Sequence, residues 1–388
     1  MDKQYIYADN AATTRMSETA VQAMLPWLTE NYGNASSLYS FSAAPQKALA
    51  EAREKVAAAI GAETGEIYFT SGGTESDNWA LRGTAYANIK KGRHLISTKI
   101  EHHAILETLE QLEREGFEVT LLPVDRYGRV NPEDLRAALR PDTTLVSVMA
   151  ANNEVGTIQP IAEIGAICHA AGVVFHTDAV QAVGHIPLDV NAMQIDLLSA
   201  SAHKFNGPKG CGFLYLRRGT RVQNLIQGGG QEKRRRSGTE NIGGICAMAA
   251  ALTEATAHLQ EESKRLSALR DRLIAGVTAL PETMLTGHPT ERLPGIASFS
   301  IKFIEGESII LSLDLAGIAA SSGSACSTAS LDPSHVLVAM GLTHEEAHGS
   351  LRLSLGRYNT EEDVDRILAE LPPIVERLRN MSPVWKKN

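Results

Sequence analysis

The chain has 388 residues, 43% of them hydrophobic and 21% charged, with a formal net charge of -8 and a pI near 5.9. This length can bury a large core and suffices for two domains. The acidic balance argues against a nucleic-acid or anionic-membrane partner, because both bind basic surfaces. The N-terminal stretch has no apolar segment typical of a signal peptide, and the longest purely apolar run, 245–252, is too short to cross a bilayer. We therefore expect a cytoplasmic protein that binds neither nucleic acid nor membrane.

Short runs rich in β-branched and aromatic residues recur between residues 67 and 216, and helical stretches separate most of them. They are 67–70, 94–97, 119–122, 145–149, 173–177, 197–201 and 211–216. Strands that alternate with helices predict a mainly parallel sheet covered by helices on both faces. In such a sheet ligands lie beyond the carboxyl ends of the strands, so the polar residues that follow each strand are candidates for function.

The second half of the chain begins with a glycine- and arginine-rich segment, 227–244, which predicts a functional loop. A helical pattern over 245–280 follows it and leads toward a second domain. From 282 onward, short strands such as 296–303 and 351–358 alternate with helices. This pattern indicates a smaller α/β domain.

The four cysteines, Cys168, Cys211, Cys246 and Cys326, are spread along the chain without a CxxC pair. This spacing fits neither a disulfide framework nor a zinc knuckle, so no metal site is predicted. Cys326 lies in the run SSGSACST, where small residues surround the thiol. A structural cysteine normally lies among larger apolar residues, so this run favours an exposed, working thiol.

The segment FTSGGTES, residues 69–76, places two glycines and several hydroxyl groups where a strand passes into a helix. Free N–H groups at a helix N-terminus, together with the helix dipole, form a natural phosphate site. Gly73 and Thr74 are therefore candidate phosphate ligands. A glycine turn with a Ser or Thr N-cap would give the same pattern.

Asp178 and Lys204 each follow a predicted strand, the first after 173–177 and the second after 197–201. An acid buried at a strand end is costly unless it meets a positive group, and a lysine in such a place favours nucleophilic use. Pyridoxal phosphate requires this pair, a lysine for the Schiff base and a carboxylate that keeps the ring nitrogen protonated. A structural Asp–Lys ion pair is the alternative.

Three further polar residues follow strands or lie within them. His102 comes after the strand around 94–97 and could stack on a flat ring and move protons, although a solvated loop histidine is the competing interpretation. Asn153 has an amide suited to a phenolic oxygen or a carboxylate, and a turn explains it equally well. Arg352 lies in an alternating run, where its planar fork suits a substrate carboxylate or simply faces solvent.

Together these segments resemble the cysteine desulfurases of the NifS/IscS family, which are aminotransferase class V proteins with the fold-type-I architecture. The matching segments run in family order over almost the whole chain, at 7–14, 70–78, 101–102, 152–154, 178–181, 201–204, 236–241, 321–326 and 352–357. The resemblance implies an α/β fold in which a mainly parallel seven-stranded sheet forms a large cofactor-binding domain, residues 16–258. Residues 1–15 and 259–388 would form the smaller domain that carries the catalytic cysteine loop.

The resemblance also implies a role for each candidate residue. Lys204 would bond to the cofactor, Asp178 would pair with its ring nitrogen, and His102 would stack on the ring and act as a catalytic proton carrier. The remaining cofactor contacts would come from Gly73, Thr74, Asn153, Gln181, Ser201, His203 and, from the second subunit of a homodimer, Thr239. Substrate L-cysteine would be bound by Asn34, Asn153 and Arg352.

The implied activity is conversion of L-cysteine to L-alanine, with the sulfur carried as a persulfide on Cys326. The sulfur would pass to an acceptor such as a U-type iron–sulfur scaffold. Whether Cys326 also contacts a transient iron–sulfur cluster is left open by the resemblance. A loop that completes a partner's site, such as 227–244, would not need to pack in its own core. A selenocysteine lyase or a class V aminotransferase is the nearest alternative activity, and a noncatalytic partner of sulfur-assembly factors is a more distant one.

Overall fold

The computed structural model describes residues 5–322, 332–383 and 385. Its largest element is a seven-stranded sheet with the strand order β2-β8-β7-β6-β5-β3-β4. The strands are β2 (Ile67–Thr70), β3 (His94–Thr98), β4 (Glu118–Leu122), β5 (Thr143–Ser147), β6 (Val174–Asp178), β7 (Leu197–Ser201) and β8 (Gly212–Leu216). Only β8 runs against its neighbours, β7 and β2. The predicted mainly parallel seven-stranded sheet is thereby confirmed.

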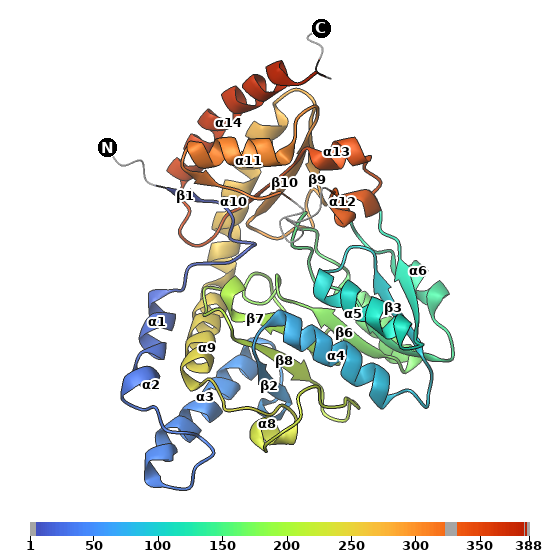
Figure 1. The fold of residues 1–388 in the computed structure, drawn as a ribbon, viewed down its shortest axis with the longest axis vertical. Coiled ribbons are helices and arrows are strands. Elements are labelled where there is room, and N and C mark those ends of the chain that lie inside the picture. Colours follow the sequence, from blue (N-terminus) through green and yellow to red (C-terminus); the bar gives the residue numbers. More distant parts are fainter. Residues whose placement is uncertain (1–4, 323–331, 384, 386–388) are drawn as a thin grey trace.

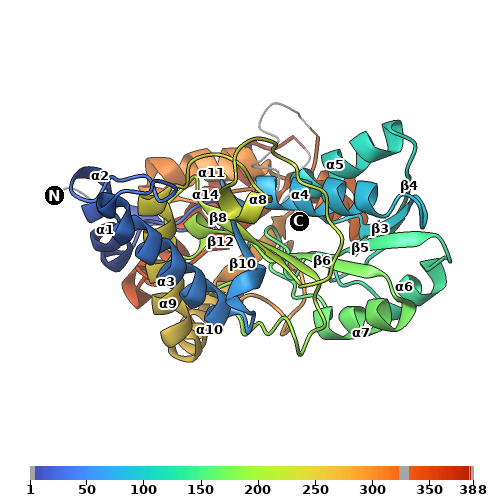
Figure 2. The ribbon, with the colours of Figure 1, turned by 90° about the horizontal axis from the view of Figure 1, so that it is seen from below.

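Helices cover both faces of this sheet, as the view along it shows (Figure 2). The helices and 3₁₀ turns of this part are α1 (Glu18–Met24), α2 (Pro26–Thr29), η1 (Ser40–Ser42), α3 (Ala43–Ala59), η2 (Thr64–Glu66), α4 (Gly73–Ala87), α5 (His103–Arg114), α6 (Pro132–Ala138), α7 (Ile161–Ala171), η3 (Ala202–Lys204), α8 (Gln231–Arg234) and α9 (Ile242–Ala257). α4 and α5 pack on one face through a core that includes Trp79 and Leu109, whereas α3, α7 and α9 pack on the other. All strands but the edge strand β4 are almost wholly buried because both faces are covered.

A second core forms around a three-stranded antiparallel sheet with the order β12-β10-β9. Its elements are α10 (Leu259–Thr278), β9 (Thr283–Thr286), β10 (Ile296–Ile301), α11 (Gly306–Leu315), β11 (Ile318–Ala319), α12 (His335–Ala339), α13 (His344–His348), β12 (Ser350–Ser354) and α14 (Glu361–Met381). The N-terminal strand β1 (Ile6–Tyr7) pairs with β11, so the start of the chain belongs to this upper body in Figure 1.

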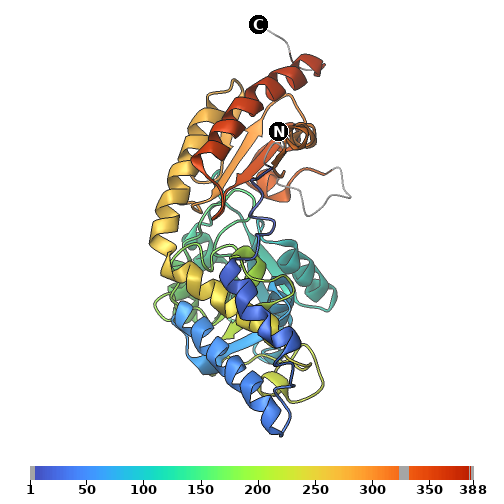
Figure 3. The same cartoon turned by 90° about the vertical axis from the view of Figure 1, so that its left-hand side faces the viewer.

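The predicted helical segment 245–280 is two helices, because α9 ends at Ala257 and α10 starts at Leu259 with a bend of 73° between them. Figure 3 shows this bend where the chain passes from the lower body to the upper one. The division into domains at 258/259 remains a prediction. Among the described residues no single helix is long and apolar enough to cross a membrane, and α9 and α10 meet that test only together, across their bend.

Candidate active site

The carboxyl ends of β6 and β7 lie side by side and bring the predicted site residues together. β6 pairs with β7 in parallel, with Asp178 opposite Ser199, and Asp178 is the last residue of its strand. Ser201 ends β7, and Lys204 follows in the short turn η3. Because neighbouring parallel strands end at the same edge, an acid and an amine from separate strands share one site.

Asp178 is buried, with 5% of its surface exposed, and its Oδ1 accepts a hydrogen bond of 2.9 Å from the Val180 N–H. Burial raises the pKa of this carboxyl, whereas His102, that N–H group and Lys204 act to lower it. A buried carboxylate is stabilised in its charged form when a cation contacts its other oxygen. The site therefore favours a ligand that carries a positive charge at this point.

Lys204 is held by the N-terminal segment. Its Nζ donates to the carbonyl oxygens of Ala11 at 2.6 Å and Ala12 at 2.8 Å. Gln181 also donates from Nε2 to the Ala11 carbonyl, at 2.9 Å. The same backbone turn thus orients the Lys204 amine and the predicted ring contact Gln181. These carbonyl partners could not be predicted, because backbone acceptors leave no residue-type signal in a sequence.

His102 is the N-cap of α5, and its Nδ1 accepts a hydrogen bond of 3.1 Å from the Ala104 N–H. Burial lowers the pKa of His102, while the nearby Asp178 acts in the opposite direction. A neutral imidazole whose Nδ1 is an acceptor must carry its hydrogen on Nε2. The cap therefore fixes the tautomer and leaves Nε2–H for a ligand, which argues against a solvated loop histidine.

A hollow at the start of α4 collects the predicted phosphate ligands. It is lined by Ala12, Thr13, Ser71, Gly72, Gly73, Thr74, Glu75, Ser201, His203, Lys209 and Gly210. α4 has no side-chain N-cap, since Gly72 occupies that position, so the N–H groups of its first turn face the hollow. Lys209 was not predicted, and it adds a positive charge.

These groups fit pyridoxal phosphate. The hollow offers N–H and hydroxyl donors for a phosphate, and the buried carboxyl and the amine lie beside it on β6 and η3. A Cβ on Gly73 would lie 2.6 Å from Val180 Cγ2, so only glycine lets the first turn of α4 pack against the segment that carries Asp178. His203 has a pKa lowered to about 4, first by burial and then by Lys204 and Lys209, so its ring is neutral.

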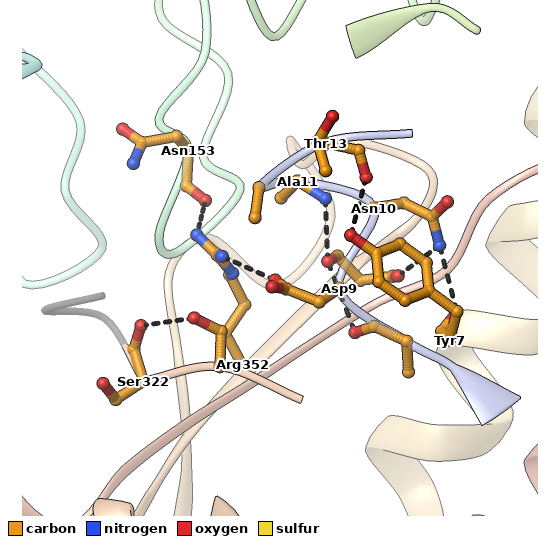
Figure 4. Close-up of polar contacts among 12 residues, drawn as sticks. Tyr7, Asp9, Asn10, Ala11, Thr13, Asn153, Ser322 and Arg352 are labelled. Atoms are coloured by element: carbon orange, nitrogen blue, oxygen red, sulfur yellow. Dashed lines mark hydrogen bonds and ion pairs between the residues drawn. The ribbon is translucent and has the colours of Figure 1, made fainter. Parts of the chain in front are cut away.

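Arg352 forms a second group, on β12 of the smaller sheet (Figure 4). It is buried, with 3% exposed, and it donates from Nη1 to the Asn153 carbonyl and from Nη2 to Asp9 Oδ1, both at 2.9 Å. Its Nε–H is buried and has no partner among the described residues. An arginine on a solvent-facing strand is therefore excluded, and the fork retains a donor for a carboxylate.

Asp9 was missed by the sequence interpretation, although it lies within the matching segment 7–14. The same segment contacts both halves of the site, because Ser354 of β12 bonds the backbone of Asn10 while His203 bonds that of Thr14. Figure 4 shows Asp9 and Ala11 on this segment beside Arg352. This bridging role depends on backbone groups, so an interpretation of the motif through its side chains alone could not predict it.

Asn152, next to Asn153 in the sequence, stabilises the turn after β5, since its Oδ1 accepts hydrogen bonds from the N–H groups of Glu154 and Val155. Turn formation thus explains Asn152. The backbone carbonyl of Asn153 contacts Arg352, so these two residues, both predicted to bind substrate, lie together.

Two predicted site residues, Asn34 and Thr239, are not brought to this centre by their own chain. Asn34 is exposed in the loop after α2, where its Oδ1 accepts from the Ser36 N–H. Thr239 is exposed in the segment after α8. Cys326 lies outside the described residues. In the part of the chain that the structure describes, no group of three or more His, Cys, Asp or Glu side chains is arranged to hold a metal ion.

Most of the segment 227–244 is exposed or half-buried, which fits a loop that need not pack in its own core, although Glu232 and Ser237 within it are buried. Glu232 is buried and pairs with Arg53 through two hydrogen bonds of 2.6 Å. Arg236 pairs with Glu75 at 2.8 and 3.0 Å, beside the phosphate hollow. The glycine- and arginine-rich composition predicted a functional loop, but these long-range charge pairs do not follow from local composition.

Comparisons with known proteins agree over the whole chain. The profile of the family described as aminotransferase class V matches residues 6–367. The chain is 56% identical to a cysteine desulfurase IscS of Methanosarcina thermophila over 386 residues, covering 100% of this chain and 96% of the relative. It is 48% identical to the cysteine desulfurase NifS of Azotobacter vinelandii, covering 99% of this chain and 96% of the relative.

Solved structures give the same result. A NifS-like protein superposes with a TM-score of 0.92 at 40% identity and covers 97% of this chain and 100% of its own. A structure described as SspA in complex with cysteine has a TM-score of 0.81 at 33% identity, with coverage of 92% and 100%. The fold is therefore shared over more than nine-tenths of the chain.

Proposed function

The chain belongs to the cysteine desulfurases of the aminotransferase class V family, and we propose that it converts L-cysteine to L-alanine with the residues described above. One observation carries the assignment of roles. The amine of Lys204, the carboxyl of Asp178 and the imidazole of His102 act electrostatically on one another at the carboxyl edge of the sheet, next to a hollow rich in donors. This combination supports pyridoxal phosphate as the cofactor.

Pyridoxal phosphate supplies an electron sink for the charge that is left when an amino acid loses its α-proton. Asp178 would keep the ring nitrogen protonated, and the donors of the hollow would hold the phosphate. Gln181 and Asn153 would surround the ring hydroxyl. His102 would stack on the ring with its Nε2–H available to the substrate.

Arg352 would bind the α-carboxylate of cysteine through its remaining donors, while Asp9 keeps the guanidinium oriented. Lys204 would remove the α-proton and later return a proton. The carbonyls of Ala11 and Ala12 give its ammonium form a defined place between these transfers. Substrate and amine would thus be aligned by one backbone segment, 9–12.

Cys326 would complete the reaction. Its thiolate attacks the sulfur of the substrate, the carbon–sulfur bond breaks, and a sulfur–sulfur bond forms on the enzyme. Protons supplied by Lys204 and His102 then allow alanine to leave. A cysteine and a thiol are consumed, and an alanine and a persulfide are produced, so the step balances.

A homodimer is part of the proposal, because Thr239 and Asn34 are exposed and lie outside their own chain's centre. The loops around α1, α2 and η1 also expose an apolar group, Leu25, Leu28, Tyr32, Leu38, Tyr39 and Phe41. Exposed large apolar side chains that gather into a patch mark protein contacts. A second copy seated there would cover it and could bring Thr239 to the phosphate hollow.

The persulfide would then pass to a sulfur acceptor, such as a U-type iron–sulfur scaffold protein. The test for this step uses protein preloaded with cysteine and then freed of it, mixed with the acceptor. Sulfur should appear on the acceptor in proportion to the persulfide lost.

The assigned cofactor roles are tested by borohydride reduction of the purified protein, followed by peptide mapping. The cofactor should be fixed to the peptide that contains Lys204, and Lys204→Ala should yield no such adduct and no alanine from cysteine. Sustained alanine production by Lys204→Ala would refute the role of this lysine. Alanine formed only when a keto acid is supplied would indicate an aminotransferase instead.

A further inference from the structure

The sheet face under α4 changes from apolar to polar along four adjacent strands, β3, β5, β6 and β7. Leu95, Leu145 and Leu197 belong to the apolar core with α4 and α5. Side chains two residues apart share a face of a strand, so Ser97, Ser147 and Ser199 continue the same face toward the carboxyl ends. On β6 this face carries His176 and then Asp178. A polar layer therefore lies directly before the site.

Asp77 of α4 reaches into this layer. It is 1% exposed, and its Oδ1 has no hydrogen-bond partner among the described residues, although it lies 3.7 Å from His176 Nε2. Burial raises the pKa of this carboxyl, Asp178 raises it further, and the Ser199 hydroxyl lowers it as a hydrogen-bonding neighbour. The catalytic scheme above does not use Asp77, yet a buried acid with so few partners is costly when ionised.

The charges around Asp77 and Asp178 differ. The main charge that acts on Asp77 is that of Asp178 of β6, whereas burial raises the pKa of Glu101 to about 8 and lowers that of His176 to about 3, so both of these are neutral at pH 7. By contrast, Asp178 has His102, Lys204 and a backbone N–H acting in its favour. When two neighbouring buried acids share one negative charge, the charge resides where cations and donors face it. That place is Asp178.

The hydrogen bonds in the layer have two consistent directions. His176 Nε2 lies 3.0 Å from Ser199 Oγ, and His176 Nδ1 lies 2.8 Å from Ser147 Oγ. If Asp77 carries a proton, it donates to Ser199, which donates to His176 Nε2, and His176 Nδ1–H donates to Ser147. If Asp77 is ionised, every one of these bonds reverses.

We propose that Asp77 is a positioning residue that holds the proton of the buried pair, so that the negative charge stays on Asp178. Asp77 donates to Ser199, and the chain of donors continues through His176 to Ser147. The inference rests on the proposed function, since it explains why the acid nearest the cofactor ring remains ionised. It also explains why the layer contains serines rather than cations, because a lysine there would draw the charge away from Asp178.

The experiment compares Asp77→Asn and Asp77→Val in the cofactor-loaded protein. Thr84→Val is the matched control, because Thr84 lies on the same helix and its buried hydroxyl also has no hydrogen-bond partner among the described residues. Asn keeps a donor toward Ser199 and is as neutral as the protonated acid. Asp77→Asn should retain kcat within about threefold and leave unchanged the pH dependence of the cofactor absorption, whereas Asp77→Val should lower kcat about tenfold or more through loss of the donor.

Infrared difference spectra report the protonation state of Asp77 directly, which a purely structural role of this residue would not determine. Wild type minus Asp77→Asn should show the C=O band of a protonated carboxyl at neutral pH, and wild type minus Thr84→Val should show none. A carboxylate band in the first difference, or loss of activity in Asp77→Asn as severe as in Asp77→Val, would overturn the proposal. The band needs no turnover, so a protein that shows it yet makes no alanine would refute the function and leave the proton assignment standing.

Discussion

The most demanding prediction concerns Arg53→Met, which removes the buried partner of Glu232. Arg53 and Glu232 have side chains that are only 9% and 3% exposed, and they are joined by two hydrogen bonds of 2.6 Å. Glu232 also accepts from the Phe69 N–H at 3.0 Å. Breaking a buried pair of this kind costs about 3–5 kcal/mol when the remaining charge stays buried.

The turn itself stores strain that changes the outcome. Glu232, Lys233 and Arg234 all have positive φ, at 44°, 56° and 65°. Left-handed conformations cost such residues about 1–2 kcal/mol each. Without Arg53 the turn can therefore open, which hydrates Glu232 and relieves the strain. We expect local opening rather than global unfolding.

Limited trypsin digestion measures this opening, because four consecutive basic residues, 233–236, become accessible when the turn is released. A loss of about 3 kcal/mol corresponds to roughly 100-fold faster cleavage when opening precedes cutting. Arg93→Met is the control, since Arg93 bonds the carbonyls of Glu115 and Gly116 at the surface and does not touch this turn.

A second change tests the cause. Adding Glu232→Gln to Arg53→Met should recover part of the stability, because no unpaired charge is left to bury. Cleavage of Arg53→Met at the wild-type rate, with an unchanged Tm, would refute the reasoning.

Three further predictions concern the site. Gly73→Ala should raise the dissociation constant for pyridoxal phosphate about tenfold, because the new Cβ overpacks against Val180, whereas Gly65→Ala should not. Arg352→Lys should raise KM for cysteine about tenfold or more, with a smaller change in kcat, because the charge remains and the fork is lost; an unchanged KM would contradict this. Burial raises the pKa of Glu101 to about 8, above its ordinary 4.5. Between these two pH values the folded state keeps a proton that the unfolded state loses, so the free energy of unfolding falls by about 1.4 kcal/mol per pH unit. The Tm of Glu101→Gln minus the Tm of the wild type should therefore be larger at pH 8 than at pH 5. An equal difference at the two pH values would contradict this prediction.

The sheet could be predicted from the sequence because its signals are local. Runs such as 94–97 and 197–201 are buried on both faces and end in polar residues, which fixed both the strands and the edge where Asp178 and Lys204 meet. The break between α9 and α10 could not be predicted. It falls at His258, where no glycine or proline interrupts the helical pattern, so tertiary packing decides the bend.

The contacts missed at the site join residues that are distant in sequence. Asp9 meets Arg352 across 343 positions, and Arg53 meets Glu232 across 179. Neither pair leaves a pattern in a single sequence. The carbonyls of Ala11 and Ala12 that hold Lys204 belong to small apolar residues, whose side chains gave no reason to expect a polar role.

Mass spectrometry of the protein after incubation with L-cysteine tests the central claim most directly. The peptide containing Cys326 should gain the mass of one sulfur atom, and alanine should form in equal amount during the first turnover. Cys326→Ser should lose the sulfur adduct while its cofactor absorption still responds to cysteine. A persulfide on Cys168, Cys211 or Cys246 in place of Cys326, or alanine formation by Cys326→Ser at the wild-type rate, would contradict the account.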